Sequence, residues 1–289
     1  MTDATTQVFS QQRELLFSMV YNILGSVADT EDVLQETWLA WSGRQQGGEP
    51  VEHPRAYLVR IAVNRALAQQ AVISRRRETY VGPWLPEPIV RPLEDGDREG
   101  DTESVSMAML VVLETLTPLE RAVFVLHEVF GYAHTEIGDI LGRSAAAVRQ
   151  VAHRARGHVH ARRPRFEPDP RVQQEATERF LAAALGGDLD ALMQILAPDV
   201  TLWGDGAGHA GGVRPLQGRD KVAKLLAALA GRSGEGLDVR YRSVNGEPSA
   251  LLVAGGVPFA VVTLDLTPDG RQISGIYVVA NPDKLTHVD

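Results

Sequence analysis

The segment "HTEIGDILGRSAAAVRQVAHRAR", residues 134–156, spaces its glycines and aliphatic residues in a way that few folds allow. Gly138 falls where one helix would press on the next, so a side chain would hold the two apart. Gly142 follows four residues later, at a turn where a positive φ angle is expected and glycine tolerates it best. Val148, six residues further on, would pack into the angle between the helices. This spacing predicts a helix-turn-helix, with the hydroxyl of Ser144 capping the second helix.

The second helix of this motif separates apolar from polar residues. Val148, Val151, Ala152 and Ala155 share one side, and arginine, glutamine and histidine occupy the other. Arginine can bind guanine O6 and N7 and glutamine can bind adenine N6 and N7, so we expect Arg149 and Gln150 to read bases. The other basic residues would position the backbone, and a plain solvated basic face is the alternative. The residues predicted to contact DNA here are Ser144, Arg149, Gln150, His153, Arg154 and Arg156.

Length and composition fit a soluble chain of two or three domains, with 289 residues, 44% of them apolar and 23% charged. The chain has no cysteine, which excludes disulfides, thiolate zinc sites and thiol catalysis. No window reaches the ~18 apolar residues that a membrane span needs, so we expect a cytoplasmic protein that binds no membrane. We expect no cofactor and no metal.

Charge is distributed unevenly along the chain. The net charge is −8, which argues against a protein that coats nucleic acid. However, residues 143–165 contain seven arginines and no acid, whereas residues 94–103 contain six acids and one arginine. The sequence therefore predicts a basic binding surface and a separate acidic tether.

Apolar residues recur at helical spacing through most of the first 163 residues. Residues 10–77 predict an all-helical domain, in which Gly25 and the pair Asp29-Thr30 end one helix and a proline at 54 starts a long one. Residues 105–163 predict four shorter helices, one of them opened by Thr117-Pro118-Leu119-Glu120. The segment between them, residues 81–104, has the prolines and acids of a linker.

The pattern changes after the proline-rich segment 163–170. Two helices, a strand and a third helix precede alternating apolar runs that end in Asn-Gly, Gly-Gly and Asp-Gly turns, as antiparallel strands do. The predicted fold is therefore multidomain, with two all-α domains followed by an α+β domain. The predicted domains are 1–80, the linker 81–104, 105–165 with the helix-turn-helix, and 166–289.

The order of these motifs resembles the extracytoplasmic-function (ECF) sigma factors. "LLFSMVYNILGSVADTEDVLQETWLAW" followed by "HPRAYLVRIAVNRALAQQ" resembles their regions 2.1 to 2.4, and residues 105–163 resemble their region 4. The resemblance implies a surface that docks on the clamp helices of the largest subunit of RNA polymerase, formed by Asp32, Gln35, Glu36 and Trp38. It also implies contacts to the −10 element from Tyr57, Arg60, Asn64, Arg65, Gln69, Arg75, Arg76 and Arg77.

Several of these residues have a simpler reading. Trp38 and Trp41 are more typical of a core than of a contact surface, and Tyr57 shares that reading. Asp29 and its acidic neighbours also suit the first turn of a helix. The interpretation of these residues as contacts to polymerase and DNA depends on the order of the motifs rather than on any single residue.

The α+β segment resembles the SnoaL-like, NTF2-like cone fold. A subgroup of ECF sigma factors carries such a domain fused to the chain, together with a "WLPEP" linker, a glycine-rich motif after an aspartate and a terminal "NPDKL". All three motifs occur here, although Ala207 and His209 depart from the glycine-rich pattern. The resemblance implies contacts between domains from Trp84, Leu85, Pro86, Glu87, Pro88, Asp205, Gly206, Gly208, His209, Asn281, Pro282, Asp283, Lys284 and Leu285.

Trp84 is out of place on a free linker, because burying an indole of that size is worth a few kcal/mol. We expect "WLPEP" to dock in a seam between the helical part and the α+β domain, near the Asp205 loop or the "NPDKL" tail. The half of the linker beyond about Ile89 would then remain an acidic tether.

The function implied is that of a promoter-specificity subunit whose partners are bacterial core RNA polymerase and promoter DNA. The α+β domain would act mainly as an intramolecular regulator, with a small-molecule sensor as the second reading. Asp205, His209 and Asp265 could serve as a general base, but nothing in the sequence pairs them, so we expect no enzyme. The alternative function is a ligand-responsive helix-turn-helix regulator that works without core polymerase.

Overall fold

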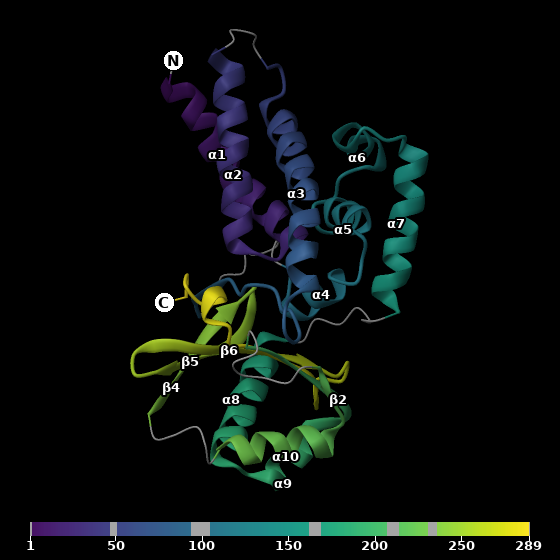
Figure 1. The fold of residues 1–289 in the computed structure, drawn as a ribbon. Helices are drawn as coiled ribbons and strands as arrows, with labels where there is room; N and C mark the ends of the chain where they lie inside the picture. The colour runs from purple at the N-terminus through teal and green to yellow at the C-terminus, as the bar shows by residue number, and fades with distance from the viewer. Residues whose placement is uncertain are drawn as a thin grey trace. The chain divides into compact units, whose positions relative to one another are not determined.

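The computed structural model describes residues 2–46, 51–93, 105–161, 169–206, 214–230 and 236–288 (Figure 1). Its described residues form two compact units. The helical unit takes those within 1–78, 99–105 and 112–163, and the α+β unit takes those within 79–98, 106–111 and 164–289. The two helical segments for which separate domains were predicted thus belong to one unit. The proximal half of the predicted linker belongs with the sheet.

Three long helices, which run side by side in Figure 1, begin the helical unit: α1 (Thr2–Leu24), α2 (Val27–Gln46) and α3 (Pro54–Glu78). Gly25 ends α1 with a φ of 70°, and its amide donates to Tyr21 O. The predicted break is therefore confirmed, although α1 begins earlier than residue 10. Trp41 is 2% exposed and its Nε1 donates to Thr5 O at 3.0 Å, so it is a core residue.

The shorter helices follow along the chain as α4 (Met107–Leu113), α5 (Pro118–Phe124), the π-helix η1 (Val125–Val129), α6 (His134–Leu141) and α7 (Ala145–His160), and most of α4 belongs to the α+β unit. Thr117 caps α5: its hydroxyl accepts from Glu120 N, and the Glu120 carboxylate accepts from Thr117 N at 3.1 Å. The predicted start signal is confirmed. The π-helix continues α5 directly and was not predicted, because no sequence pattern marks an i to i+5 bond.

In the described part of the α+β unit, α8 (Pro170–Gly186), α9 (Leu189–Ile195) and α10 (Arg219–Ala230) lie on one face of a seven-stranded sheet (Figure 1). The strand order is β1-β4-β5-β6-β7-β2-β3, and all neighbours are antiparallel except β2 and β7. The strands are β1 (Val90–Pro92), β2 (Leu196–Asp205), β3 (Leu216–Gln217), β4 (Leu237–Val244), β5 (Glu247–Ala254), β6 (Val257–Leu266) and β7 (Ile273–Val279).

Each face of this sheet has its own core. The helices pack on the face that carries Leu252, Val262 and Ile276. The other face carries Leu251, Val261 and Val279, and it is covered by Leu85 of the predicted linker, Met107 of α4 and Leu285 near the end of the chain. The short 3-10 helix η2 (Pro282–Lys284) lies in that last segment. The second core therefore depends on segments far apart in sequence.

Candidate nucleic-acid interface and linker anchor

The turn between α6 and α7 has the geometry that its glycines predict. Gly142 has φ 64° and ψ 39°, in the left-handed region, and it ends α6. A Cβ on Gly138 would lie 2.6 Å from Arg143 O, closer than packing allows. Val148 is fully buried beneath the turn, and the Ser144 hydroxyl accepts from Ala147 N at 3.2 Å. Ser144 is therefore the cap of α7, and its O–H stays able to donate.

Gly142→Ala should destabilise the helical unit by about 1–2 kcal/mol, because an L-residue is strained at this φ. Gly157→Ala is the matched control: Gly157 lies in α7 without a positive φ, and its Cβ would meet nothing within 4 Å. That change should stabilise by up to about 1 kcal/mol. Chemical denaturation of both variants checks the prediction, and equal effects of one sign would contradict it.

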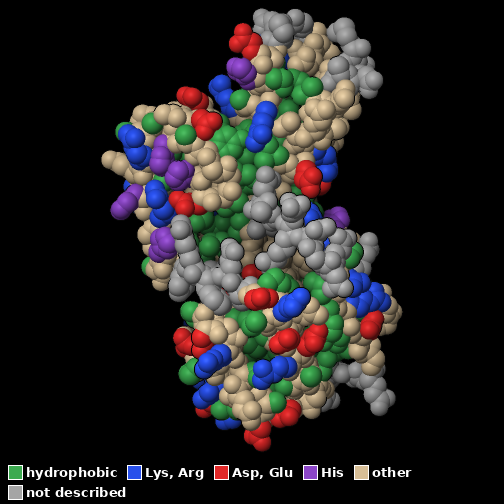
Figure 2. Space-filling view, turned by 180° about the vertical axis from the view of Figure 1, so that it is seen from behind, with side chains coloured by type: hydrophobic (Ala, Val, Ile, Leu, Met, Phe, Trp, Pro, Cys, Tyr) green, Lys and Arg blue, Asp and Glu red, His purple; other side chains and the backbone are tan. Residues whose placement is uncertain are grey.

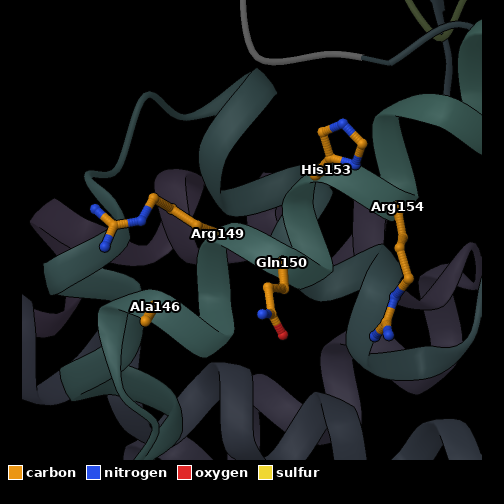
Figure 3. Close-up of a pocket in the computed structure, with 5 residues that line it drawn as sticks. All are labelled: Ala146, Arg149, Gln150, His153 and Arg154. Carbon is orange, nitrogen blue, oxygen red and sulfur yellow. The ribbon is translucent and has the colours of Figure 1, made fainter.

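One stripe of α7, here called the recognition face, consists of Ala146, Arg149, Gln150, His153 and Arg154, and it lines a surface pocket. Figure 3 shows the long side chains of Arg149, Gln150 and Arg154 extending from the helix with their polar ends outward. In the view from behind, basic and histidine side chains gather at the left over the helix-turn-helix (Figure 2). No residue that the structure describes forms a hydrogen bond or ion pair with the side chains of Arg149 or Gln150.

Arg154 and Arg156 do have carboxylate partners. Arg154 Nε lies 3.5 Å from Glu120 Oε1, and Arg156 Nε lies 3.3 Å from Glu128 Oε1. Sequence reasoning missed both partners. The capping role of Glu120 could be predicted from residues 117–120, but no pattern in the adjacent sequence predicts that its second oxygen lies beside α7.

Two histidines lie next to this face. The rings of His127 and His134 have centroids 4.2 Å apart, and His127 Nδ1 is 2.8 Å from Tyr132 O. Burial lowers the pKa of His134, and the charges of His127, Arg149 and Arg156 lower it further. Its imidazole is therefore held neutral near pH 7.

The polar residues of α3 predicted to meet the −10 element mostly contact other parts of the helical unit. Asn64 Nδ2 donates to Ile140 O at 2.8 Å, Gln69 Nε2 donates to Asp29 Oδ1 at 2.6 Å, and Arg76 lies 3.1 Å from the same carboxylate. Arg65 pairs with Glu36, and Tyr57 is half-buried with its ring 6.0 Å from that of Trp41. Among the described arginines of the predicted set, only Arg60 and Arg75 are exposed and form no ion pair with a described residue.

Arg77 belongs to a buried arginine cluster, formed with Glu114 and Arg121. Glu114 pairs with both guanidinium groups, and Arg121 Nε donates to Asn22 O at 3.0 Å. Burial lowers the pKa of Arg121 to about 9 and, together with the charge of Arg121, that of Arg77 to about 9. Both groups remain charged at neutral pH, so the cluster joins α1, α3 and α5 through charges buried around one carboxylate.

The residues of α2 predicted to dock on polymerase lie on its exposed side, with one exception. Asp32, Gln35 and Glu36 are exposed, whereas Trp38 is half-buried and its ring lies 5.3 Å from that of Phe9. Leu39, which the sequence did not single out, is 61% exposed on the same helix. An apolar side chain so exposed among acids fits a contact surface.

A second site, here called the linker anchor, surrounds the carboxylate of Asp205. Its members are Tyr80, Trp84, Leu85, Asp205, Asn281 and Lys284. Leu85 N donates to Asp205 Oδ2 at 2.8 Å, and Lys284 Nζ lies 2.7 Å from the same oxygen. Tyr80 OH donates to Asp205 Oδ1, and Lys284 also donates to Leu85 O. The linker backbone is thus held by an ion pair that is itself almost fully buried.

Trp84 contacts the cation of this ion pair. Lys284 Nζ lies 3.5 Å from the centroid of the Trp84 ring, and the Tyr80 ring meets that indole edge-on at 4.7 Å. Asn281 Nδ2 donates to Tyr80 OH at 3.0 Å. Tyr80 was not predicted, because a single tyrosine in a polar stretch carries no sequence signal.

The remaining residues of the "WLPEP", glycine-rich and "NPDKL" motifs differ in how far they are buried. Pro86, Pro88, Gly206 and Leu285 are buried, Glu87 is half-buried, and Pro282 and Asp283 are exposed. Gly208 and His209 lie outside the described residues, as does the acidic run after residue 93. Asp265 is half-buried on β6 opposite Gly275 and away from Asp205 in the sheet.

Among the described residues, no group of three or more histidine, aspartate or glutamate side chains could hold a metal ion. No described helix is long and apolar enough to cross a membrane.

Family models for Sigma-70 region 2 and for Sigma-70, region 4 match residues 8–76 and 106–159. The chain is 38% identical to the ECF RNA polymerase sigma factor SigJ of Mycobacterium tuberculosis, across 96% of this chain and 92% of that protein. It is 28% identical to the probable ECF RNA polymerase sigma factor SigI of that species, across 98% and 95%. The crystal structure of M. tuberculosis SigJ matches with a TM-score of 0.77 and 35% identity, over 97% of this chain and 98% of that one.

Proposed function

This chain belongs to the family of ECF RNA polymerase sigma factors, and from that premise we propose that it directs bacterial core polymerase to promoters. The observation that carries the proposal is the recognition face, where Arg149 and Gln150 extend outward beside the arginines of α7. Arginine and glutamine in a major groove distinguish guanine and adenine. The −35 element is therefore the proposed target of α7.

Binding to core polymerase is assigned to the exposed side of α2, with Asp32, Gln35, Glu36 and the exposed Leu39. Binding to the −10 element is assigned to α3, where Arg60 and Arg75 are open to solvent. The polar residues of α3 that hold carboxylates in this structure would exchange those partners for DNA. Carboxylate and phosphate both accept from the same guanidinium edges, so the exchange conserves the type of hydrogen bond.

The α+β unit is proposed to regulate the chain through the linker anchor rather than by bond chemistry. Asp205 accepts bonds from Leu85 N, Tyr80 and Lys284, so its carboxylate is neither exposed nor open to a substrate. A general base needs such access. The anchor instead fixes the chain that leaves α3, which gives the α+β unit control of the connection between the two promoter-binding segments.

The test of the proposal is promoter-dependent transcription by bacterial core polymerase supplemented with the purified chain. We expect transcripts from a matched promoter only when the chain is present. A chain that binds duplex DNA alone while the core enzyme stays inert would instead be a regulator that works without polymerase.

Arg149→Ala should relax selection at one or two −35 bases, at about 1–3 kcal/mol for each preferred base. Arg156→Ala is the comparison, because Arg156 lies two turns beyond Arg149, does not line the pocket and has its Nε side on Glu128; its loss should weaken every promoter equally. Affinity of the reconstituted holoenzyme for a panel of −35 variants measures both. Uniform weakening by Arg149→Ala would make it a phosphate contact.

A further inference from the structure

The closest contact is of the same kind in the two carboxylate pairs of α7. In both, the arginine atom nearest the carboxylate is Nε, at 3.5 Å from Glu120 Oε1 for Arg154 and 3.3 Å from Glu128 Oε1 for Arg156. A guanidinium presents five N–H groups in a rigid fork. A carboxylate on the Nε side leaves terminal N–H groups for a second acceptor.

The exposed fractions of these side chains agree with an inner Nε side that faces the carboxylate and an outer side that faces solvent. The carboxylates are the buried partners, with side chains 9% exposed in Glu120 and 19% in Glu128, whereas Arg154 and Arg156 are 62% and 40% exposed. The Nε atom of Arg156 is itself buried and forms no hydrogen bond with a described residue, so Glu128 acts on it through charge at 3.3 Å, and the exposed surface of that side chain lies on its other atoms. The outward parts of both arginines are therefore available to a ligand while their inner parts face protein.

Glu120 is charged at neutral pH despite its surroundings. Burial raises its pKa, but hydrogen bonds from Thr117 and the charges of His158 and Arg154 outweigh burial, so the net pKa lies below its usual value. Glu128 lies on the π-helix η1, an element in which one turn contains an extra residue and which often occurs at functional sites.

The two pairs lie on opposite sides of the base-reading residues. At 100° per residue, Arg156 projects within about 20° of Arg149, and Arg154 within about 40° of Gln150. Glu128 therefore supports the side of α7 that carries Arg149, and Glu120 supports the side that carries Gln150.

We propose that Glu120 and Glu128 are positioning residues for promoter recognition: each holds a phosphate-binding arginine from behind, on either side of Arg149 and Gln150. The inference rests on the proposed function. It adds that the affinity of α7 for DNA depends on two acids, although a bare acid near DNA would repel phosphates. If the proposal holds, the gain from orienting the arginines must outweigh the repulsion between the glutamates and the phosphates. Neutralising either glutamate should therefore weaken DNA binding.

The experiment measures the affinity of the holoenzyme, formed from the full chain and core polymerase, for promoter DNA over a range of salt concentrations. Glu128→Gln should weaken binding by about 3- to 10-fold at every −35 sequence. Glu120→Gln should do the same, and glutamine preserves the capping box with Thr117. In Arg156→Gln, the slope of log affinity against log salt should fall by about 0.9. Adding Glu128→Gln to Arg156→Gln should change nothing further.

Asp139→Asn is the matched control, because Asp139 is an exposed acid of α6 for which no described residue is an ion-pair partner. It should leave affinity unchanged or raise it slightly. Tighter or unchanged binding by Glu128→Gln would overturn the inference, as would an equal loss in the Arg156→Gln background. Failure of the unmodified holoenzyme to select promoters would instead reject the proposed function.

Discussion

Lys284→Met should destabilise the α+β unit by about 3–5 kcal/mol, because it leaves the carboxylate of Asp205 buried without its cation. The side chains of Lys284 and Asp205 are 3% and 0% exposed, so water cannot replace the lost partner. Methionine keeps the unbranched shape, which limits the loss of packing against Trp84. Denaturation and hydrogen exchange at the Leu85 amide measure the effect, and we expect exchange to accelerate throughout residues 79–93.

Two further variants make this result interpretable. Lys221→Met removes an exposed lysine from α10 and should change stability by less than about 0.5 kcal/mol. Combining Asp205→Asn with Lys284→Met should recover part of the loss, because neither charge is then left alone in the interior. An effect of Lys284→Met no larger than that of Lys221→Met would show that the ion pair does not hold the linker.

Features of the fold that arise within a few residues were predictable from the sequence. The break at Gly25, the capping box at Thr117 and the left-handed turn at Gly142 each depend on the conformational preferences of adjacent residues. Strand β1 was not predictable in this way. Val90 pairs with Val244 and Pro92 with Arg242, so the strand exists because of a partner about 150 residues away.

The same distinction, between features set by adjacent residues and features set by distant partners, holds for the candidate site. The exposed stripe of α7 follows from helical periodicity, and it was predicted correctly as the polar face of that helix. The ionic partners of the predicted DNA-binding arginines were not predicted. Asp29, Glu36 and Glu114 lie 29 to 47 residues from the α3 side chains that they hold, and no spacing rule connects them. Arg77, which was predicted to contact DNA, forms an ion pair with the mostly buried Glu114 in this structure, and its contact with DNA stays a prediction.

For Trp84, the neighbouring residues in the sequence predicted that the side chain is docked but not which residues it contacts. An indole beside prolines predicted docking, and the structure places Trp84 against Lys284 and Tyr80 within the α+β unit. The proximity of Asp205 followed from a family motif rather than from geometry. The predicted seam with the helical part remains a prediction.

Glu114→Gln should destabilise the helical unit by about 3–5 kcal/mol. Arg121 is 1% exposed, the Arg77 side chain is 22% exposed, and both remain charged at neutral pH, so Glu114 supplies the negative charge between two largely desolvated cations. Glutamine keeps the size of the side chain and one acceptor oxygen but removes the charge. The loss is therefore that of breaking a buried ion pair and not that of opening a cavity.

Glu31→Gln is the control for this prediction, because Glu31 pairs with Arg13 at 2.7 Å with both side chains about half exposed. It should cost less than about 1 kcal/mol, since solvent screens an exposed pair. Chemical denaturation of both variants at low and high salt separates the cases: added salt should reduce the small effect of Glu31→Gln and leave that of Glu114→Gln nearly unchanged. Equal costs in the two variants would mean that the arginine cluster is hydrated, and that α3 is not held to α1 and α5 by buried charge.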